Sequence, residues 1–151
     1  MTAARLRPAT DADVPRLAEL VEAAYGHYVE RIGRPPGPMT YDYAEVVRRF
    51  DVTVAELGSE VVGLVVLGTD DEGFVLENVA VDPAHQGSGI GRALLEHAEQ
   101  AARQAGYDSI YLYTHELMAE NLELYGRIGY VEYDRRREDW AARVFMRKQL
   151  G

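Results

Sequence analysis

A glycine-rich turn between a strand-like segment and a helix-like segment is the part of the sequence best suited to chemistry. Residues 86–91 are Gln-Gly-Ser-Gly-Ile-Gly, placed after a short apolar run and before a segment whose apolar residues recur at helical spacing. Glycines let the backbone come close to a ligand, and the first N–H groups of a helix lack internal partners and carry partial positive charge. The turn is therefore predicted to hold a phosphate group. A turn that merely joins strand to helix is the alternative.

Two common phosphate-binding motifs do not fit this turn. A Walker loop requires Gly-Lys-Ser/Thr, whereas Gly91 is followed by Arg92. A dinucleotide fingerprint, G-x-G-x-x-G, would need its last glycine at Arg92 or Leu94, depending on the glycine that begins it. The spacing that remains is Gln86-x-x-Gly89-x-Gly91, preceded by Val79-Ala80-Val81-Asp82-Pro83.

This spacing resembles the GCN5-related N-acetyltransferase (GNAT) family, in which Arg/Gln-x-x-Gly-x-Gly/Ala on a strand-to-helix turn binds the pyrophosphate of acetyl-CoA. The preceding Val-x-Val-x-Pro and the later Leu124-Tyr125-x-x-x-Gly129-Tyr130 strengthen the resemblance, which covers nearly the whole chain. It implies acetyl-CoA as co-substrate. The implied cofactor-binding residues are Val79, Ala80, Val81, Gln86, Gly87, Ser88, Gly89, Ile90, Gly91, Arg92 and Asn121.

Asn121 departs from the family pattern. Many members carry the corresponding asparagine seven residues before the tyrosine, where this chain has Met118. Asn121 lies one helical turn before Tyr125 and could also be an exposed helix residue.

The resemblance also implies two catalytic residues. Tyr125 stands where the family places its general acid, and an ordinary tyrosine pKa of about 10 leaves the hydroxyl able to protonate a leaving thiolate. Glu77 interrupts an otherwise apolar strand at a position where members often carry the base. A carboxylate with a pKa of about 4.3 is a poor base for an amine unless burial raises that pKa, so a relay through water is expected. The alternatives are a core aromatic at Tyr125 and a solvent-facing or ion-paired Glu77.

The rest of the chain must position these residues. The predicted order is β-α-α-β-β-β-α-β-α-β-β, an α/β fold of the α+β type with a GNAT-like mixed, mostly antiparallel sheet of six to seven strands and helices on both faces. Because a helix separates segments 74–81 and 109–113, these two strands are predicted to lie parallel. The almost wholly apolar segment 61–67 indicates a central strand covered on both faces.

The flanking segments complete the predicted fold. One helix is expected from about residue 10 to residue 31, then an irregular proline loop over 33–38 and a short helix over 43–50. Segments 130–136 and 143–148 are expected to pair as a final hairpin around Asp139-Trp140.

Length and composition bound the class of protein. The 151 residues predict a single domain, 1–151, and no apolar run approaches the roughly 20 residues of a membrane span. The absence of cysteine excludes disulfides and a cysteine nucleophile and favours a cytoplasmic location, as does a segment 1–8 without the apolar stretch of a signal peptide. The net charge of −9 argues against a nucleic-acid partner, and the four histidines lack the spacing of a metal site, so no metal is predicted.

The sequence therefore predicts an acetyl-CoA-dependent N-acetyltransferase that moves an acetyl group to a primary amine of a small molecule or peptide by direct transfer. A non-catalytic acetyl-CoA sensor or regulatory module is the alternative. Tyr25, Tyr28 and the tyrosines after the proline loop could line an acceptor pocket or fill the edges of the core. The exposed final strands are compatible with a homodimer.

Overall fold

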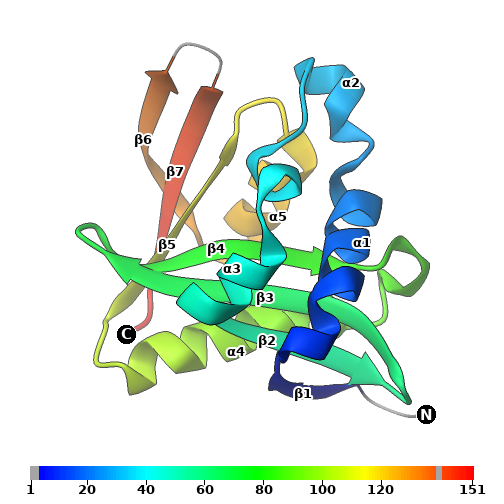
Figure 1. The fold of residues 1–151 in the computed structure, drawn as a ribbon. Coiled ribbons are helices and arrows are strands. Elements are labelled where there is room, and N and C mark those ends of the chain that lie inside the picture. The colour runs from blue at the N-terminus through cyan, green and yellow to red at the C-terminus, as the bar shows by residue number, and fades with distance from the viewer. Residues whose placement is uncertain (1–3, 139–140) are drawn as a thin grey trace.

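A seven-stranded sheet organises the chain (Figure 1). The computed structural model describes residues 4–138 and 141–151. The strand order is β1-β2-β3-β4-β5-β7-β6, and every neighbouring pair is antiparallel except β4 and β5. The strands are β1 (Arg5–Pro8), β2 (Asp51–Leu57), β3 (Glu60–Asp70), β4 (Gly73–Val81), β5 (Ser109–His115), β6 (Val131–Glu138) and β7 (Ala141–Gln149). The predicted mixed, mostly antiparallel sheet with one parallel pair is confirmed.

Helices cover both faces of the sheet. In Figure 1, α4 lies on one side of β2–β4 and α1 with α3 on the other. The helices are α1 (Val14–Tyr25), α2 (Tyr28–Ile32), α3 (Tyr43–Arg49), α4 (Ile90–Gln104) and α5 (Ala119–Arg127), with short 3₁₀ helices η1 (Asp11–Asp13), η2 (Gly37–Thr40) and η3 (Pro83–His85).

Two predictions for the first third of the chain are wrong. The single helix expected over residues 10–31 is divided into η1, α1 and α2, with a break at Gly26. The backbone is so tight there that a Cβ atom on Gly26 would lie 2.7 Å from the Glu22 carbonyl oxygen. The proline loop is not wholly irregular either, because Pro38 favours the first turn of η2 and the Thr40 hydroxyl donates to the Gly37 carbonyl. The predicted turn at Asp139-Trp140 lies outside the described residues.

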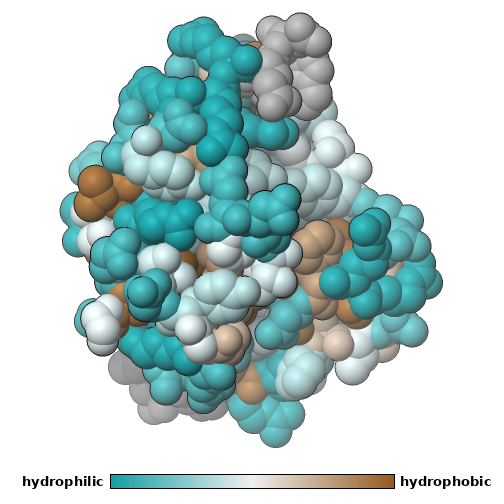
Figure 2. All heavy atoms as spheres, turned by 90° about the vertical axis from the view of Figure 1, so that its left-hand side faces the viewer, coloured by the Kyte–Doolittle hydropathy of each residue, from teal (hydrophilic) through white to brown (hydrophobic). Residues whose placement is uncertain are grey.

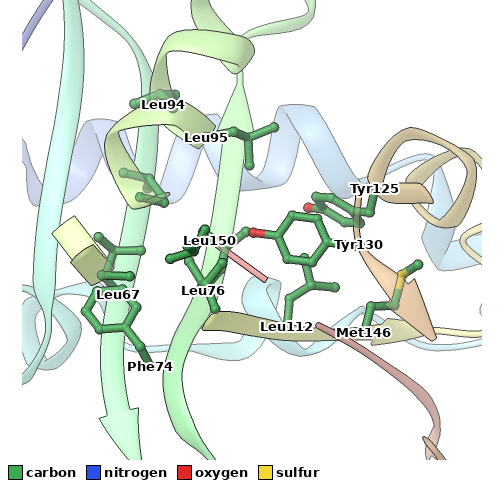
Figure 3. Packing of buried hydrophobic residues seen from close by; sticks show 14 of the residues in the cluster. Leu67, Phe74, Leu76, Leu94, Leu95, Leu112, Tyr125, Tyr130, Met146 and Leu150 are labelled. Atoms are coloured by element: carbon green, nitrogen blue, oxygen red, sulfur yellow. The ribbon is translucent and has the colours of Figure 1, made fainter. Parts of the chain in front are cut away.

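Strand β3 is the centre of the core. Residues 61–67 are all buried, which confirms the prediction that this strand is covered on both faces. Leu64 packs in one cluster with Leu17 and Leu20 of α1, whereas Val65 packs in a second cluster with Leu94 of α4. Figure 3 shows part of the α4-side cluster, which extends to Tyr125 and Tyr130 beyond the end of β5. The two tyrosines therefore belong to the part of the core formed by the chain that follows β5.

The outer surface is mainly polar on the face shown in Figure 2, with hydrophobic residues in small groups among hydrophilic ones. Val131 and Tyr133 on β6 are exposed, and a homodimer through the final strands stays a prediction. In the part of the chain that the structure describes, no helix has the length and apolar character of a membrane span.

Truncation of the central strand tests this account of the core. Leu64→Ala removes a side chain with no exposed surface, and such changes lower the free energy of unfolding by about 2–5 kcal/mol. The matched control is Val131→Thr, on a side chain that is 68% exposed, which should stay within about 0.5 kcal/mol of the parent. Urea denaturation measures both, and equal effects of the two changes would contradict the central position of β3.

Candidate active site

The sheet opens between β4 and β5. The two parallel strands are paired in register only at Val75 and Tyr111, after which each continues without the other. A register shift in the β3–β4 ladder lies at the same place, because Val66 pairs with Asn78 whereas Leu67 pairs with Leu76. Glu77 is therefore the extra residue of a β-bulge, a feature that bends a strand and re-aims its side chains.

Two hollows meet at this opening. The first, called here the turn-side groove, runs along Val79–Val81 between the α1–α2 segment and α5 and ends at Gln86, Gly87 and Gly91. The second, called the loop-side pocket, lies between the proline loop and the diverging ends of β4 and β5, and it contains about 850 Å³ of space, its open mouth included. The residues that line both hollows are Tyr25, Val79, Asn121 and Tyr125.

The glycine turn supplies unpaired donors at one end of the groove. Gly87 and Gly89 have φ angles of +84° and +89°, which a residue with a side chain adopts only under strain, and a Cβ at either position would meet no protein atom within 4 Å. Helix α4 begins after Gly89 without a side-chain cap, so the N–H groups of its first turn have no partner within the helix. Asp82 steadies the approach to the turn, since it accepts hydrogen bonds from Ala84 N–H and from Arg16 of α1.

The predicted turn residues do not all face the groove. Gln86, Gly87 and Gly91 line it, whereas the Ser88 hydroxyl donates to the His85 carbonyl. The Ile90 side chain is buried in the core, and the Arg92 side chain is 85% exposed and pairs with Glu96. Ser88, Gly89, Ile90 and Arg92 are not among the residues that line the groove, so the prediction for these four concerns their backbone N–H groups.

Tyr125 stands at the junction of the two hollows. Its side chain is only 6% exposed, and its hydroxyl has no hydrogen-bond partner among the described residues. Burial raises the pKa of Tyr125 above its ordinary value, so the hydroxyl stays protonated and can donate. Its ring packs edge-on against the ring of Tyr130, and the two ring centroids are 5.7 Å apart. Figure 3 shows the two rings next to each other. Tyr125 is therefore both a core aromatic residue and an available proton donor. The two roles that the sequence offered as alternatives are compatible.

Glu77 points into the loop-side pocket. Burial raises the pKa of its carboxyl group, the negative charge of Asp70 raises it further, and Arg143 opposes the shift. The half-buried carboxylate is thus a stronger base than an exposed glutamate. The solvent-facing alternative for Glu77 does not describe this position.

A hydrogen-bonded network that the sequence did not predict fixes the strand beside the junction. The Tyr25 hydroxyl lies 2.8 Å from Asn78 Oδ1 and 3.0 Å from the Val79 carbonyl oxygen. Asn78 Nδ2 donates to the Tyr43 hydroxyl at 3.2 Å, and Tyr43 donates to the Pro38 carbonyl at 2.6 Å. Asn78 is 4% exposed. In the sequence, a polar residue inside an apolar strand is the signal that could have pointed to a buried, hydrogen-bonded side chain at this position. The network ties α1, α3 and the proline loop to β4.

A second set of contacts holds the groove's two walls together. Glu120 at the start of α5 accepts a hydrogen bond of 2.7 Å from Tyr28 and pairs with Arg31, both on α2. Asn121, the next residue, lines the groove and the pocket. The α2–α5 contact therefore sets the position of the predicted asparagine.

No group of three or more histidine, aspartate or glutamate side chains within residues 4–138 and 141–151 is arranged to hold a metal ion. The donors that converge on the junction are hydroxyl, amide and backbone groups.

Comparison with known proteins agrees with this geometry. The model of the acetyltransferase (GNAT) family matches residues 15–130. The chain is 35% identical over 57 residues to a streptothricin acetyltransferase of Streptomyces lavendulae, covering 38% of this chain and 30% of that protein. It is 39% identical over 62 residues to the [ribosomal protein bS18]-alanine N-acetyltransferase of Escherichia coli, covering 41% and 42%. These matches span less than half the length of either relative.

A solved structure extends the likeness to the whole fold. The PaiA N-acetyltransferase of Thermoplasma acidophilum, in complex with coenzyme A, superimposes with a TM-score of 0.80 at 16% identity over 98% of this chain and 99% of that one. The chain thus has the same overall fold as that acetyltransferase. The chain belongs to the acetyltransferase (GNAT) family, as its match over residues 15–130 shows.

The burial of Glu77 predicts a pH signature in stability. Above the raised pKa, the folded protein holds a desolvated charge that the unfolded chain hydrates, so ionised Glu77 destabilises the fold. The penalty begins to shrink as pH falls below that pKa and is gone below the ordinary glutamate pKa of the unfolded chain, where both states are protonated. We expect Glu77→Gln to be more stable than the parent at about pH 8, and the advantage to shrink toward about pH 4.5.

Chemical denaturation across this pH range measures the effect. Glu123→Gln, on an exposed position of α5, controls for the loss of one negative charge. An advantage for Glu77→Gln that is absent at about pH 8 or grows on acidification would contradict the raised pKa.

Proposed function

We propose that this protein is an acetyl-CoA-dependent N-acetyltransferase that transfers the acetyl group directly to a primary amine. The observation that carries the proposal is the junction itself: a groove that ends in the glycine turn meets a separate pocket that holds Glu77, with Tyr125 at their boundary. Two hollows that share one short boundary suit a donor and an acceptor bound at the same time. The likeness to an alanine N-acetyltransferase supports an amine acceptor.

The turn-side groove would hold acetyl-CoA. Its pyrophosphate would accept hydrogen bonds from the backbone of the turn between Gln86 and Arg92, where two glycines take left-handed conformations and the helix dipole adds positive charge. The pantetheine arm would run along Val79–Val81, where β4 has lost β5 as a partner. Asn121 would contact the arm from the opposite wall.

The loop-side pocket would hold the acceptor and remove its proton. A lysine-type amine has a pKa of about 10.4, so its deprotonation at pH 7 costs about 4.6 kcal/mol. Glu77, whose pKa is raised by burial, would take this proton directly or through water. The neutral amine would then attack the thioester carbonyl, and a backbone N–H at Val79 or its neighbour would stabilise the oxyanion.

Tyr125 would complete the transfer. As the tetrahedral intermediate collapses, the carbon–sulfur bond breaks and the leaving thiolate needs a proton, which the unpaired Tyr125 hydroxyl is placed to donate. The chain has no cysteine to form an acetyl-thioester with the enzyme, which favours direct transfer. A cytoplasmic location and a homodimer stay predictions.

The alternative is a sensor that binds acetyl-CoA without turnover. Release of free CoA, measured with a thiol reagent across amines, amino acids and peptides, separates the two functions. Turnover with any acceptor supports the enzyme, whereas tight acetyl-CoA binding with no CoA release from the whole set would favour the sensor.

The hydroxyl of Tyr125 provides the sharpest test of the chemistry. Tyr125→Phe should lower kcat by roughly 10²–10⁴-fold, as loss of a general acid does, while acetyl-CoA binds with unchanged affinity. The matched control is Tyr130→Phe, which deletes the hydroxyl of the neighbouring ring, a buried group with no partner among the described residues. Steady-state kinetics and calorimetric titration measure both variants. Equal kcat values for the two would remove Tyr125 as the acid.

The glycine turn predicts a selective loss of cofactor binding. Gly89→Leu should abolish acetyl-CoA binding, because the new side chain would enter the space in front of the unpaired N–H groups. Gly106→Leu is its control: Gly106 has a φ of +90°, against +89° at Gly89, and a Cβ there would also meet no atom within 4 Å, so both variants carry the same backbone strain. Calorimetry with acetyl-CoA measures affinity. Retained affinity in Gly89→Leu would contradict the proposed pyrophosphate site.

A further inference from the structure

The loop-side pocket has a charge pattern opposite to that of the whole chain. The protein carries 25 acidic and 16 basic side chains, with a net charge of −9. The pocket's lining nevertheless includes two arginines, Arg34 and Arg143, and a single carboxylate, Glu77. The basic side chains of the lining suit an acceptor that carries a negative charge beside its amine.

The arginines have defined places around the carboxylate. Arg34 lies at the start of the proline loop, on one wall of the pocket. Arg143 lies on β7, directly across the ladder from His115 of β5, with its guanidinium 5.0 Å from the centre of the Tyr113 ring. Arg143 also lowers the pKa of Glu77, so its charge acts on the group proposed to receive the amine proton.

His115 adds a neutral donor to the same wall. Its Nδ1 accepts a hydrogen bond of 3.1 Å from the Leu117 backbone N–H, so the ring proton lies on Nε2. Burial lowers the pKa of His115, which keeps the ring uncharged at neutral pH. The lining thus includes guanidinium and imidazole donors, and the planar guanidinium matches the geometry of a carboxylate.

The remaining lining is apolar and aromatic. The prolines at 35, 36 and 38, together with Tyr41, Tyr113 and Met118, form walls suited to an uncharged body of moderate size. The acceptor's amine must lie near Glu77 and Val79, which are two residues apart on β4. The complementary ligand therefore has an amine at the junction, a nearby anionic group and an apolar body.

We propose that the acceptor is a free amino acid, whose amine faces Glu77 and whose carboxylate is bound by Arg143 and Arg34. This inference rests on the proposed acetyl transfer and names its substrate class. A peptide N-terminus carries an uncharged amide at the corresponding position, so the arginines would discriminate against it. Arg34 and Arg143 determine specificity by binding the carboxylate, and the charge of Arg143 also acts on the pKa of Glu77, for every acceptor alike.

The test compares three forms of each acceptor: the L-amino acid, its amide and the amine without the carboxyl group, for apolar and aromatic side chains. We expect kcat/KM, corrected for the fraction of neutral amine, to be about 10- to 100-fold higher for the acid, the value of charge-assisted hydrogen bonds. Arg143→Gln and Arg34→Gln should reduce this preference to a few-fold, largely through KM. Arg48→Gln, on an exposed residue of α3 outside both hollows, should keep it.

Preference for the amide or the amine, or an unchanged preference in both arginine variants, would overturn the inference while leaving acetyl transfer intact. A binding measurement separates the two proposals: calorimetry of N-acetyl amino acids and their amides with the CoA-loaded protein. If no acceptor is turned over but the acid still binds about 10-fold more tightly, the carboxylate site stands and the transferase proposal fails. Equal binding of acid and amide overturns the carboxylate site.

Discussion

The separation of β4 from β5 is the constraint on which the site depends. A buried strand that loses its neighbour leaves backbone N–H and C=O groups without partners, and such groups are costly unless something satisfies them. Here the ladder has its one register pair at Val75 and Tyr111, and the bulge at Glu77 begins the divergence. The fold tolerates the opening because β3 and β7 hold the outer sides of the two strands. A ligand that runs along β4 can then replace the missing strand.

The packing around this opening couples binding to the rest of the fold. Asn78 and Tyr25 fasten β4 to α1, while Tyr43 links the same network to the proline loop through Pro38. Asn78 is 53 residues from Tyr25 and 35 residues from Tyr43 in the sequence, so these hydrogen bonds connect distant segments of the chain. Displacement of the loop would therefore disturb the strand on which the proposed donor lies. The two proposed binding sites therefore share one hydrogen-bonded network rather than two independent loops.

The predictions that succeeded rest on patterns of apolar and helical segments, whereas the features that were missed depend on the exact path of the backbone or on contacts across the fold. The helix between segments 74–81 and 109–113 required a parallel pair, and the apolar character of 61–67 required a central strand; both follow from the sequence alone. The bulge at Glu77 could not be seen, because a register shift belongs to two strands at once. The break at Gly26 depends on a close backbone approach, and Asn78 depends on tyrosines far along the chain.

Glu77 shows how stability and chemistry oppose each other at this site. A carboxylate half-buried among aromatic rings, with a second negative charge from Asp70 acting on it, is unfavourable for folding. The same environment makes the group a better base, and an ordinary solvated glutamate would be too acidic to hold an amine proton. Arg143 limits the penalty, yet it only partly opposes the effect of burial. The β-bulge places Glu77, whose buried charge destabilises the fold, beside the meeting point of the two hollows, where the proposed reaction needs a base. The position of Glu77 is therefore explained by the proposed chemistry and not by stability.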